Sequence, residues 1–137
     1  MTLRRKSREF ALQMLFEWDV GQQKTGQIAK HFWKSARAAE STREFATQLF
    51  EGAVAQAESN DKIIAKLAKN WKFDRLAAVD RNILRLAIYE LRNGTAPVKV
   101  VLDEAIELAK KFSSAEAPAF LNGVLDAAAK QIEAAEV

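Results

Sequence analysis

The sequence predicts an all-α protein of seven helices, and three observations carry this prediction. The 137 residues include only two prolines and five glycines, so residues that interrupt helices are scarce. Apolar residues make up 49% of the chain, enough for a packed core. Along most of the chain these apolar residues recur at i, i+3, i+4 and i+7, the spacing of one face of an α-helix.

The composition also excludes several classes of function. The chain has no cysteine and a single histidine, His31, and it contains no glycine-rich phosphate loop and no Ser/His/Asp set. No apolar run approaches the roughly 20 residues of a membrane span. We therefore expect a non-catalytic cytoplasmic protein with no metal or cofactor and no membrane segment.

Positive charge is unevenly distributed along the chain. The net charge is only +3, but residues 1–8 hold four basic side chains and no acid, and residues 61–92 hold eight basic and four acidic ones. Such an asymmetry indicates a polyanion as partner. The first eight residues are expected to form a basic arm or a ragged first turn, for which a solubilising terminus is the alternative interpretation.

The first two helices are separated by a glycine-containing break. The first is expected to begin near Ser7 and to end near Val20, with Gly21 as its C-cap. Its apolar face is broad enough to predict deep burial and consists of Phe10, Ala11, Leu12, Met14, Leu15, Phe16 and Trp18. The second helix is expected over residues 27–39, with His31 on its polar side.

Capping signals predict the next two helices. The sequence Ser41-Thr-Arg-Glu44 matches a capping box and should open the third helix, on whose inner face Gly52 would allow close approach of another helix. The cluster Ser59-Asn-Asp61 should separate it from the fourth helix. The apolar stripe of that fourth helix is Ile63, Ile64, Leu67, Ala68 and Trp71. The chain would thus divide into residues 9–58 and residues 59–137.

Residues 79–91, VDRNILRLAIYEL, are apolar over so wide a face that other helices should surround them. What this central helix leaves uncovered is a line of polar side chains at i, i+4, i+8 and i+11: Arg81, Arg85, Tyr89 and Arg92. The line is either a solvated edge or a strip facing phosphates, since arginine forks suit phosphate and tyrosine suits stacking.

Two further helices follow. Pro97 should begin the sixth helix, which continues to Phe112 and places its acids early and its lysines late, as the helix dipole favours. Pro118 lies near the first turn of the seventh, in which Gly123 is expected to permit tight packing. That makes three helices in an N-terminal group and four in a C-terminal group.

Three segments resemble the NusB family of bacterial transcription antitermination factors, and together they extend over essentially the whole chain. They are RRKSREFALQMLFEWDV near the start, VDRNILRLAIYEL in the centre, and PVKVVLDEAIELAKKF followed by AFLNGVLD. The pairing of DEAIELAKKF with FLNGVLD is specific, although no segment is a catalytic signature.

The resemblance implies one NusB-like domain over residues 1–137, with three-helix and four-helix subdomains packed together. It implies binding to the boxA element of ribosomal RNA leader transcripts together with NusE, a ribosomal protein of the small subunit. Other Nus factors and RNA polymerase would be reached indirectly. The protein would act as a monomer or a homodimer.

Site residues follow from the resemblance, position by position. RNA contacts map to the N-terminus, the central helix and the start of the last helix: Arg4, Arg5, Lys6, Arg8, Arg81, Arg85, Glu116 and Phe120. Phe120 is expected either to stack on an unpaired base or to pack in the core. Asp80, Tyr89 and the surface of the fourth to sixth helices are expected to face NusE. The family often has tyrosine where this chain has Phe16, so a hydroxyl contact is lost there.

Two other functions remain open at this point. A helical protein–protein adaptor without any RNA role would make the basic arm dispensable. An RNA-binding domain of a ribosomal RNA methyltransferase shares the fold, but it would require a long methyltransferase domain that these 137 residues do not contain.

Overall fold

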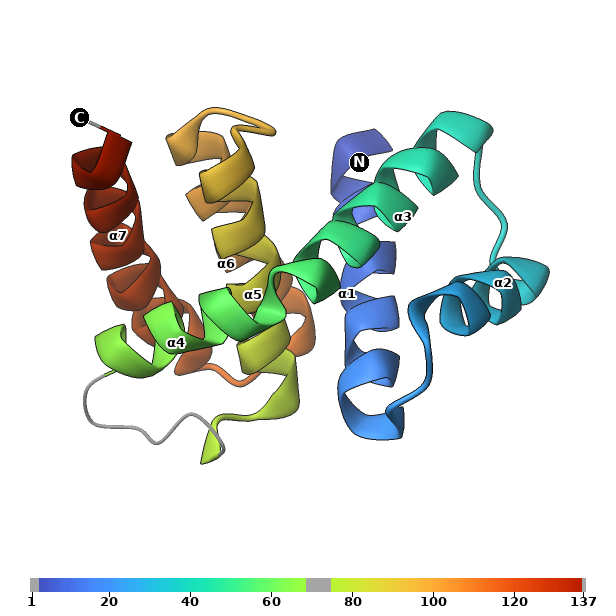
Figure 1. The fold of residues 1–137 in the computed structure, drawn as a ribbon, viewed down its shortest axis with the longest axis horizontal. Helices are drawn as coiled ribbons and strands as arrows, with labels where there is room; N and C mark the ends of the chain where they lie inside the picture. The colour runs from blue at the N-terminus through green and yellow to red at the C-terminus, as the bar shows by residue number, and fades with distance from the viewer. Residues whose placement is uncertain (1–2, 69–74, 137) are drawn as a thin grey trace.

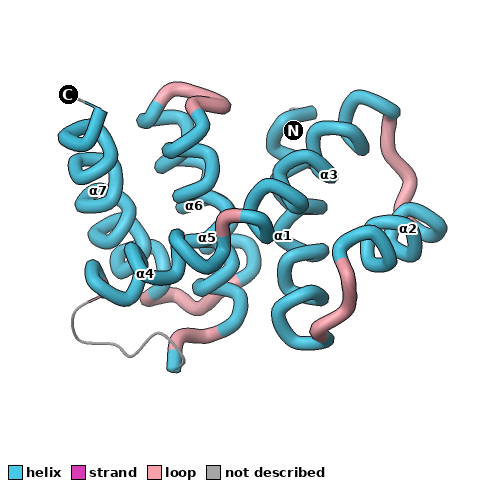
Figure 2. Tube along the Cα trace, in the orientation of Figure 1, coloured by secondary structure: helices cyan, strands magenta, loops and turns pink. Residues whose placement is uncertain are grey.

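The computed structural model describes residues 3–68 and 75–136, and in this part of the chain it contains helices and no strands (Figures 1 and 2). The seven helices found there are α1 (Leu3–Gly21), α2 (Thr25–Ser35), α3 (Glu40–Ala55), α4 (Ala57–Leu67), α5 (Ala78–Asn93), α6 (Val98–Phe112) and α7 (Ala117–Glu136). The all-α, seven-helix prediction is confirmed. Trp71, assigned above to the fourth helix, lies outside the described residues.

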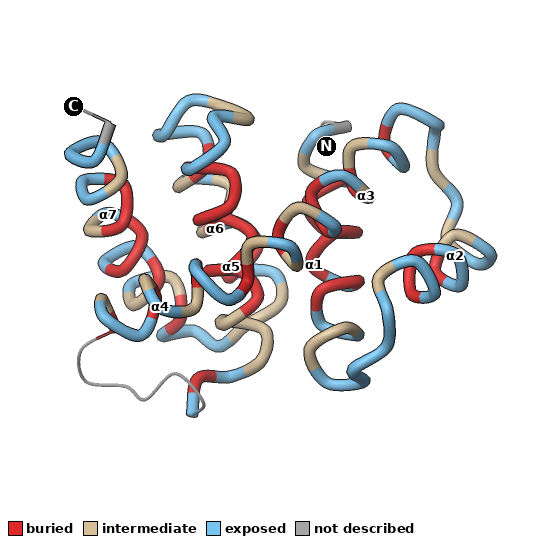
Figure 3. Tube along the Cα trace, in the orientation of Figure 1, coloured by how far each residue is buried: buried red, intermediate tan, exposed pale blue. Residues whose placement is uncertain are grey.

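Helix α5 lies at the centre of the fold and packs against α1, α3, α4, α6 and α7 (Figure 1). Every residue from 82 to 91 is buried (Figure 3). The helix ends as its sequence predicts, because Gly94 adopts the left-handed conformation (φ 60°) at the C-cap. A helix that is covered on all sides fixes the relative positions of its neighbours, so α5 determines where the surface residues of α1 and α6 lie.

The break between the two groups of helices is shorter than expected. Helices α3 and α4 follow each other in one line across the molecule, and Gln56 alone separates them (Figure 1). The Ser59–Asp61 cluster does not cap α4 but lies within it, where the Ser59 hydroxyl and the Asn60 side-chain carbonyl both accept hydrogen bonds from Arg92 of α5. These polar residues join helices rather than end one.

Two other local expectations are wrong. Helix α3 begins one residue before the Ser41 capping box, and its first turn carries no side-chain cap. Gly123 is exposed, and a Cβ atom placed there would have no neighbour within 4 Å, so it does not serve close packing.

Gly52, by contrast, does allow a close approach, as predicted. A Cβ atom at this position of α3 would lie 2.3–2.4 Å from the ring and hydroxyl of Tyr89 on α5. Tyr89 is only 8% exposed, so its ring occupies the space that Gly52 leaves.

Replacing Gly52 by alanine is therefore expected to lower the free energy of unfolding by about 1–3 kcal/mol, because the buried tyrosine ring must shift. Gly123→Ala is the matched control. It sits in an exposed helical position with open space around it, and it should stabilise the protein by about 0.5–1 kcal/mol through helix propensity. Urea denaturation of both variants tests this, and equal stabilisation by both would contradict the packing described here.

Candidate nucleic-acid interface

The basic N-terminal residues are not a separate arm but the first turns of α1, which begins at Leu3. Arg4 and Lys6 are exposed there. The Arg4 guanidinium lies 3.9 Å from the centroid of the Phe45 ring on α3, and the Lys6 ammonium lies 4.9 Å from that of Phe10. Neither side chain forms an ion pair with an acid in the described part of the chain. Both charges are therefore available to a polyanion.

Arg5 holds α1 against α6. Its Nε and Nη2 atoms each donate a hydrogen bond of 3.0 Å to the carboxylate of Glu104. These bonds, and then the charge of Glu104, raise the pKa of Arg5 above its ordinary value. The side chain remains 39% exposed, so one face of the guanidinium stays accessible to solvent.

Arg8 is buried and belongs to the core. Its guanidinium donates three hydrogen bonds of 2.8–3.2 Å to Glu90 of α5, and the two side chains are 5% and 2% exposed. Thr95, in the turn after α5, donates a further hydrogen bond of 2.8 Å to the same carboxylate. The expectation that Arg8 faces RNA from a basic arm is not met, because Glu90 covers its charge inside the protein.

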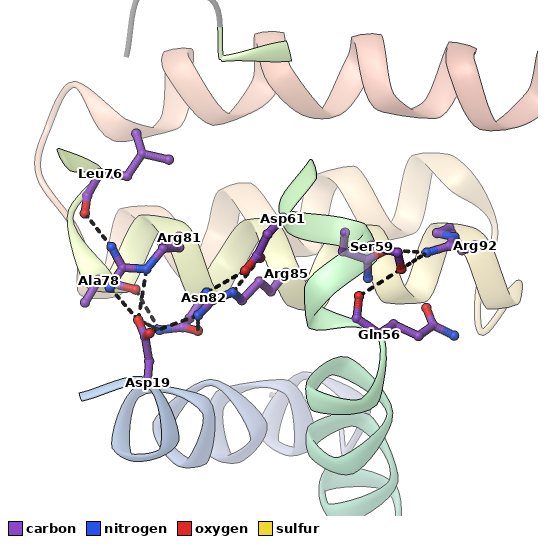
Figure 4. A network of polar contacts seen from close by, with 11 residues as sticks. Asp19, Gln56, Ser59, Asp61, Leu76, Ala78, Arg81, Asn82, Arg85 and Arg92 are labelled. Carbon is purple, nitrogen blue, oxygen red and sulfur yellow. Dashed lines mark hydrogen bonds and ion pairs between the residues drawn. The ribbon is translucent and has the colours of Figure 1, made fainter. Parts of the chain in front are cut away.

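The polar line predicted along the central helix is covered as well. Arg85 and Tyr89 are buried, and Arg81 is partly buried. Asp19, at the end of α1, accepts hydrogen bonds from Arg81 and Asn82 and forms an ion pair with Arg85 (Figure 4). The interpretation of this line as an uncovered strip is therefore wrong, since neighbouring helices bring carboxylates to it.

Arg85 is the most enclosed member of this group. Its Nε and Nη2 atoms donate hydrogen bonds of 2.8 and 2.9 Å to the two carboxylate oxygens of Asp61 on α4 (Figure 4). Burial lowers the pKa of Arg85, but the hydrogen bonds and charges of Asp61 and Asp19 raise it further, so the guanidinium stays charged. Its role in the structure is to join α1, α4 and α5.

Asp19 gives this network a pH dependence. Burial raises the pKa of its carboxyl, but hydrogen bonds from Arg81 and Arg85, with their charges, bring it below the ordinary value. A carboxyl group with a lowered folded-state pKa contributes stability fully above its unfolded pKa, about 4, and loses this contribution as the pH falls through the folded-state pKa.

Asp19→Asn is therefore expected to be less stable than the wild type at pH 7, with a difference that shrinks below about pH 4. Urea unfolding between pH 7 and pH 3 measures this. Asp126→Asn is the control, because Asp126 forms an exposed pair with Lys130 and should change stability little at any pH. A difference for Asp19→Asn that stays constant down to pH 3 would contradict the lowered pKa.

A hollow of about 270 Å³ lies where α5 and α7 begin. It brings together three residues predicted separately, because Asp80, Glu116 and Phe120 all line it. Arg75, which precedes α5, lines the same hollow and was not singled out from the sequence. The only sequence signal for it was its place in the basic stretch 61–92. A half-buried aromatic ring with a guanidinium and carboxylates around it is a plausible receptor for a nucleobase.

A second, apolar hollow of about 370 Å³ lies between α1, α5 and α6, lined by Leu12, Gln13, Phe16, Glu17, Val79 and Phe112. The expectation that Phe16 is deeply buried is wrong, because it is 39% exposed here. Large exposed aromatic groups mark sites where proteins associate. This hollow is thus a candidate for a protein contact.

The predicted RNA contacts divide between the two ends of α1. Arg4 lies near its N-terminus, whereas Asp19, near its C-terminus, adjoins the helix start that carries Asp80 and Arg81. At 1.5 Å per residue, Arg4 and Asp19 are about 22 Å apart along the helix. The apolar hollow with Phe16 lies along α1 between these ends.

The described residues include no group of three or more His, Asp or Glu side chains able to hold a metal ion. Within the same residues, no helix has the length and apolar character needed to cross a membrane.

Comparison with known proteins agrees with this geometry. Residues 5–130 match the NusB family. "Transcription antitermination protein NusB" of Koribacter versatilis is 47% identical over 133 residues, covering 96% of this chain and 91% of that protein. The protein of the same name from Trichlorobacter lovleyi is 44% identical over 127 residues, with 92% and 89% covered.

Solved structures are similar throughout. T. maritima NusB has a TM-score of 0.84 and 30% identity, with 93% of this chain and 91% of that chain covered. A crystal structure of antitermination factors NusB and NusE in complex with dsRNA has a TM-score of 0.86 and 32% identity, covering 96% and 98% of the two chains. This chain belongs to the NusB family.

Proposed function

We propose that the protein is a non-catalytic RNA-binding factor of transcription antitermination, which binds boxA RNA of ribosomal leader transcripts together with NusE. The relatives named above are antitermination proteins, and one similar crystal structure holds NusB, NusE and RNA together. The single observation that carries the proposal in this chain is the exposed pair Arg4 and Lys6, which has no acidic partner among the described residues.

RNA would be bound at two places. Arg4 and Lys6, with the exposed part of Arg5, would neutralise phosphates at the N-terminus of α1. Phe120 would stack on a base in the hollow that it shares with Arg75 and Glu116. Of the other predicted contacts, Arg8 and Arg85 would act through the fold that they hold together, because both are buried.

NusE would bind at the apolar hollow around Phe16, and the adjacent Asp80 would contribute to the edge of that contact. Tyr89 is removed from this surface, because its ring is buried against Gly52. A partner seated at this hollow would lie between the two RNA contacts. It would add its own RNA-binding surface, so that the pair binds more tightly than either protein alone.

The mechanism under this proposal is recruitment rather than chemistry. Binding to the nascent transcript and to NusE in the cytoplasm would bring other Nus factors to RNA polymerase. The subdomain division belongs to the same proposal, with its boundary placed at Gln56 between α3 and α4.

Two variants separate the two RNA contacts by their salt dependence. In the Arg4→Ala/Lys6→Ala variant, affinity for a single-stranded boxA RNA should fall, and the slope of log K against log salt should decrease by about 1.4, or 0.7 for each phosphate contact. Phe120→Ala should lose about 1–3 kcal/mol of binding free energy without a change in slope, because stacking releases no counterions. Fluorescence anisotropy with NusE present measures both quantities.

Lys62→Ala/Lys66→Ala is the control, since it removes two exposed lysines from α4. It should bind RNA like the wild type apart from a small general charge effect. Wild-type affinity in both test variants would contradict the proposed interface and would favour an adaptor that does not touch RNA.

A further inference from the structure

Helix α2 and its flanking loops carry a group of exposed cations that none of the expected RNA contacts includes. Residues 20–39 hold four basic residues and no acid, and all four are exposed. No described residue forms an ion pair with any of them. We refer to this group as the α2 cations: Lys24, Lys30, Lys34 and Arg37.

The α2 cations are connected to the N-terminus of α1 by a row of aromatic rings. Phe10, whose ring lies below the Lys6 ammonium, has its centroid 5.3 Å from that of Trp33 on α2. On α3, the Arg43 guanidinium lies 5.4 Å from the Trp33 ring. Positive charge therefore continues from Lys6 across Trp33 to α2, at the end of the molecule away from α7 (Figure 1).

Acidic residues interrupt this path at one place only in the described part of α2 and α3. Glu40 and Glu44 line the hollow beside Trp33 and Arg43. Lys30 and Lys34 follow each other at i, i+4 on the opposite side of α2 from its buried residues, which are Ile28, Ala29 and Phe32. A polyanion would thus meet the lysine side of the helix rather than the acids of α3.

We propose that the α2 cations are a second RNA contact, which holds the phosphates of nucleotides flanking the segment bound at Arg4 and Lys6. The inference rests on the proposed function and extends it to a longer stretch of transcript. Lysine ammonium groups on an exposed helix act as point charges towards phosphate and do not read bases, so the contact is independent of sequence.

RNA fits this surface better than an acidic protein does. Protein interfaces are built around buried aromatic or apolar anchors at their centre. The apolar side chains of α2 are directed into the core instead, with Ile28 and Phe32 at 1% and 9% exposure. Lysines with no apolar centre suit a phosphate backbone, for which charge alone supplies much of the affinity.

The experiment compares a minimal boxA RNA with the same RNA extended by about ten nucleotides of unrelated sequence on each side, in the presence of NusE. The test variant is Lys30→Glu/Lys34→Glu on α2. The control is Lys62→Glu/Lys66→Glu on α4, which reverses a second exposed i, i+4 lysine pair on another 11-residue helix. Both variants change the net charge equally, so any general charge effect is common to them.

For the wild type we expect tighter binding of the extended RNA and a steeper salt slope. The α2 variant should retain the affinity of the wild type for the minimal RNA relative to the control variant. It should lose most of the gain from extension, and its slope for the extended RNA should fall by about 1.4 below that of the wild type.

Equal losses in the α2 and α4 variants would overturn the inference, because a general charge effect would then explain them. Absence of any gain from extension in the wild type would also overturn it and would point to an acidic protein as the partner of α2. Failure of the minimal RNA to bind at low salt would instead refute the proposed function. The gain from extension is measured separately from that result.

Discussion

Replacing Arg8 by alanine is expected to lower the free energy of unfolding by about 3–5 kcal/mol, the usual effect of removing one partner of a buried ion pair. Glu90, 2% exposed, would keep the hydrogen bond from Thr95 but would lose the positive charge that compensates its own. Because folded domains are stable by only about 5–15 kcal/mol, this loss should be evident in urea denaturation.

A double variant shows whether the pair or the packing matters. In Arg8→Met/Glu90→Leu both charges are gone and similar volumes remain, so most of the stability should return. Arg4→Ala, four residues earlier on the same helix, is the control for a loss of positive charge and should cost about 0.5–1 kcal/mol through its contact with Phe45.

The same variants test whether Arg8 contacts RNA. If Arg8→Ala melted like the wild type but lost RNA affinity, Arg8 would face RNA in solution, and the buried pair with Glu90 would be refuted. We expect the opposite: the double variant should bind RNA almost as the wild type does.

Replacing Ile88 by aspartate is expected to unfold the protein. Ile88 is fully buried in the centre of α5, the helix against which five other helices pack. The variant loses the packing of a large aliphatic side chain, worth about 2–5 kcal/mol, and adds a carboxyl group without a partner, which costs several kcal/mol more. The sum approaches the whole stability of a domain.

Ile88→Val is the control, and it should cost only about 0.5–1.5 kcal/mol. Circular dichroism and thermal melting distinguish the two results. A cooperative, native-like melting curve for Ile88→Asp would show that the central position assigned to α5 is wrong.

The fold could be predicted in detail because it depends on a periodic signal. The apolar spacing of α5 and α6 and the glycine at the end of α5 are local properties of the chain, and the structure confirms them. The space for Tyr89 at Gly52 was also anticipated, since a glycine on the inner face of a helix has few other uses.

The polar residues could be predicted less well. A helical wheel treats Arg85 and Arg8 as surface groups, because a charged residue is normally exposed. Their burial depends on Asp19, Asp61 and Glu90, which other helices bring to them from 24 to 82 positions away in the sequence. Spacing along one helix contains no information about such partners.

Phe16 is the complementary case. Its place on the apolar side of α1 predicts burial, but the neighbouring helices leave it partly exposed beside Val79 and Phe112. An apolar residue that the fold leaves uncovered looks the same in the sequence as one in the core. The hollow around it could be recognised only in the structure.

The most direct test of the proposed function is fluorescence anisotropy of a labelled single-stranded boxA RNA with the wild-type protein, with and without NusE, over a series of salt concentrations. We expect affinity that falls steeply with salt and that increases when NusE is added, whereas an RNA of scrambled sequence should bind more weakly. Absence of binding at low salt both with and without NusE, or binding that is insensitive to salt, would contradict a role in RNA recognition.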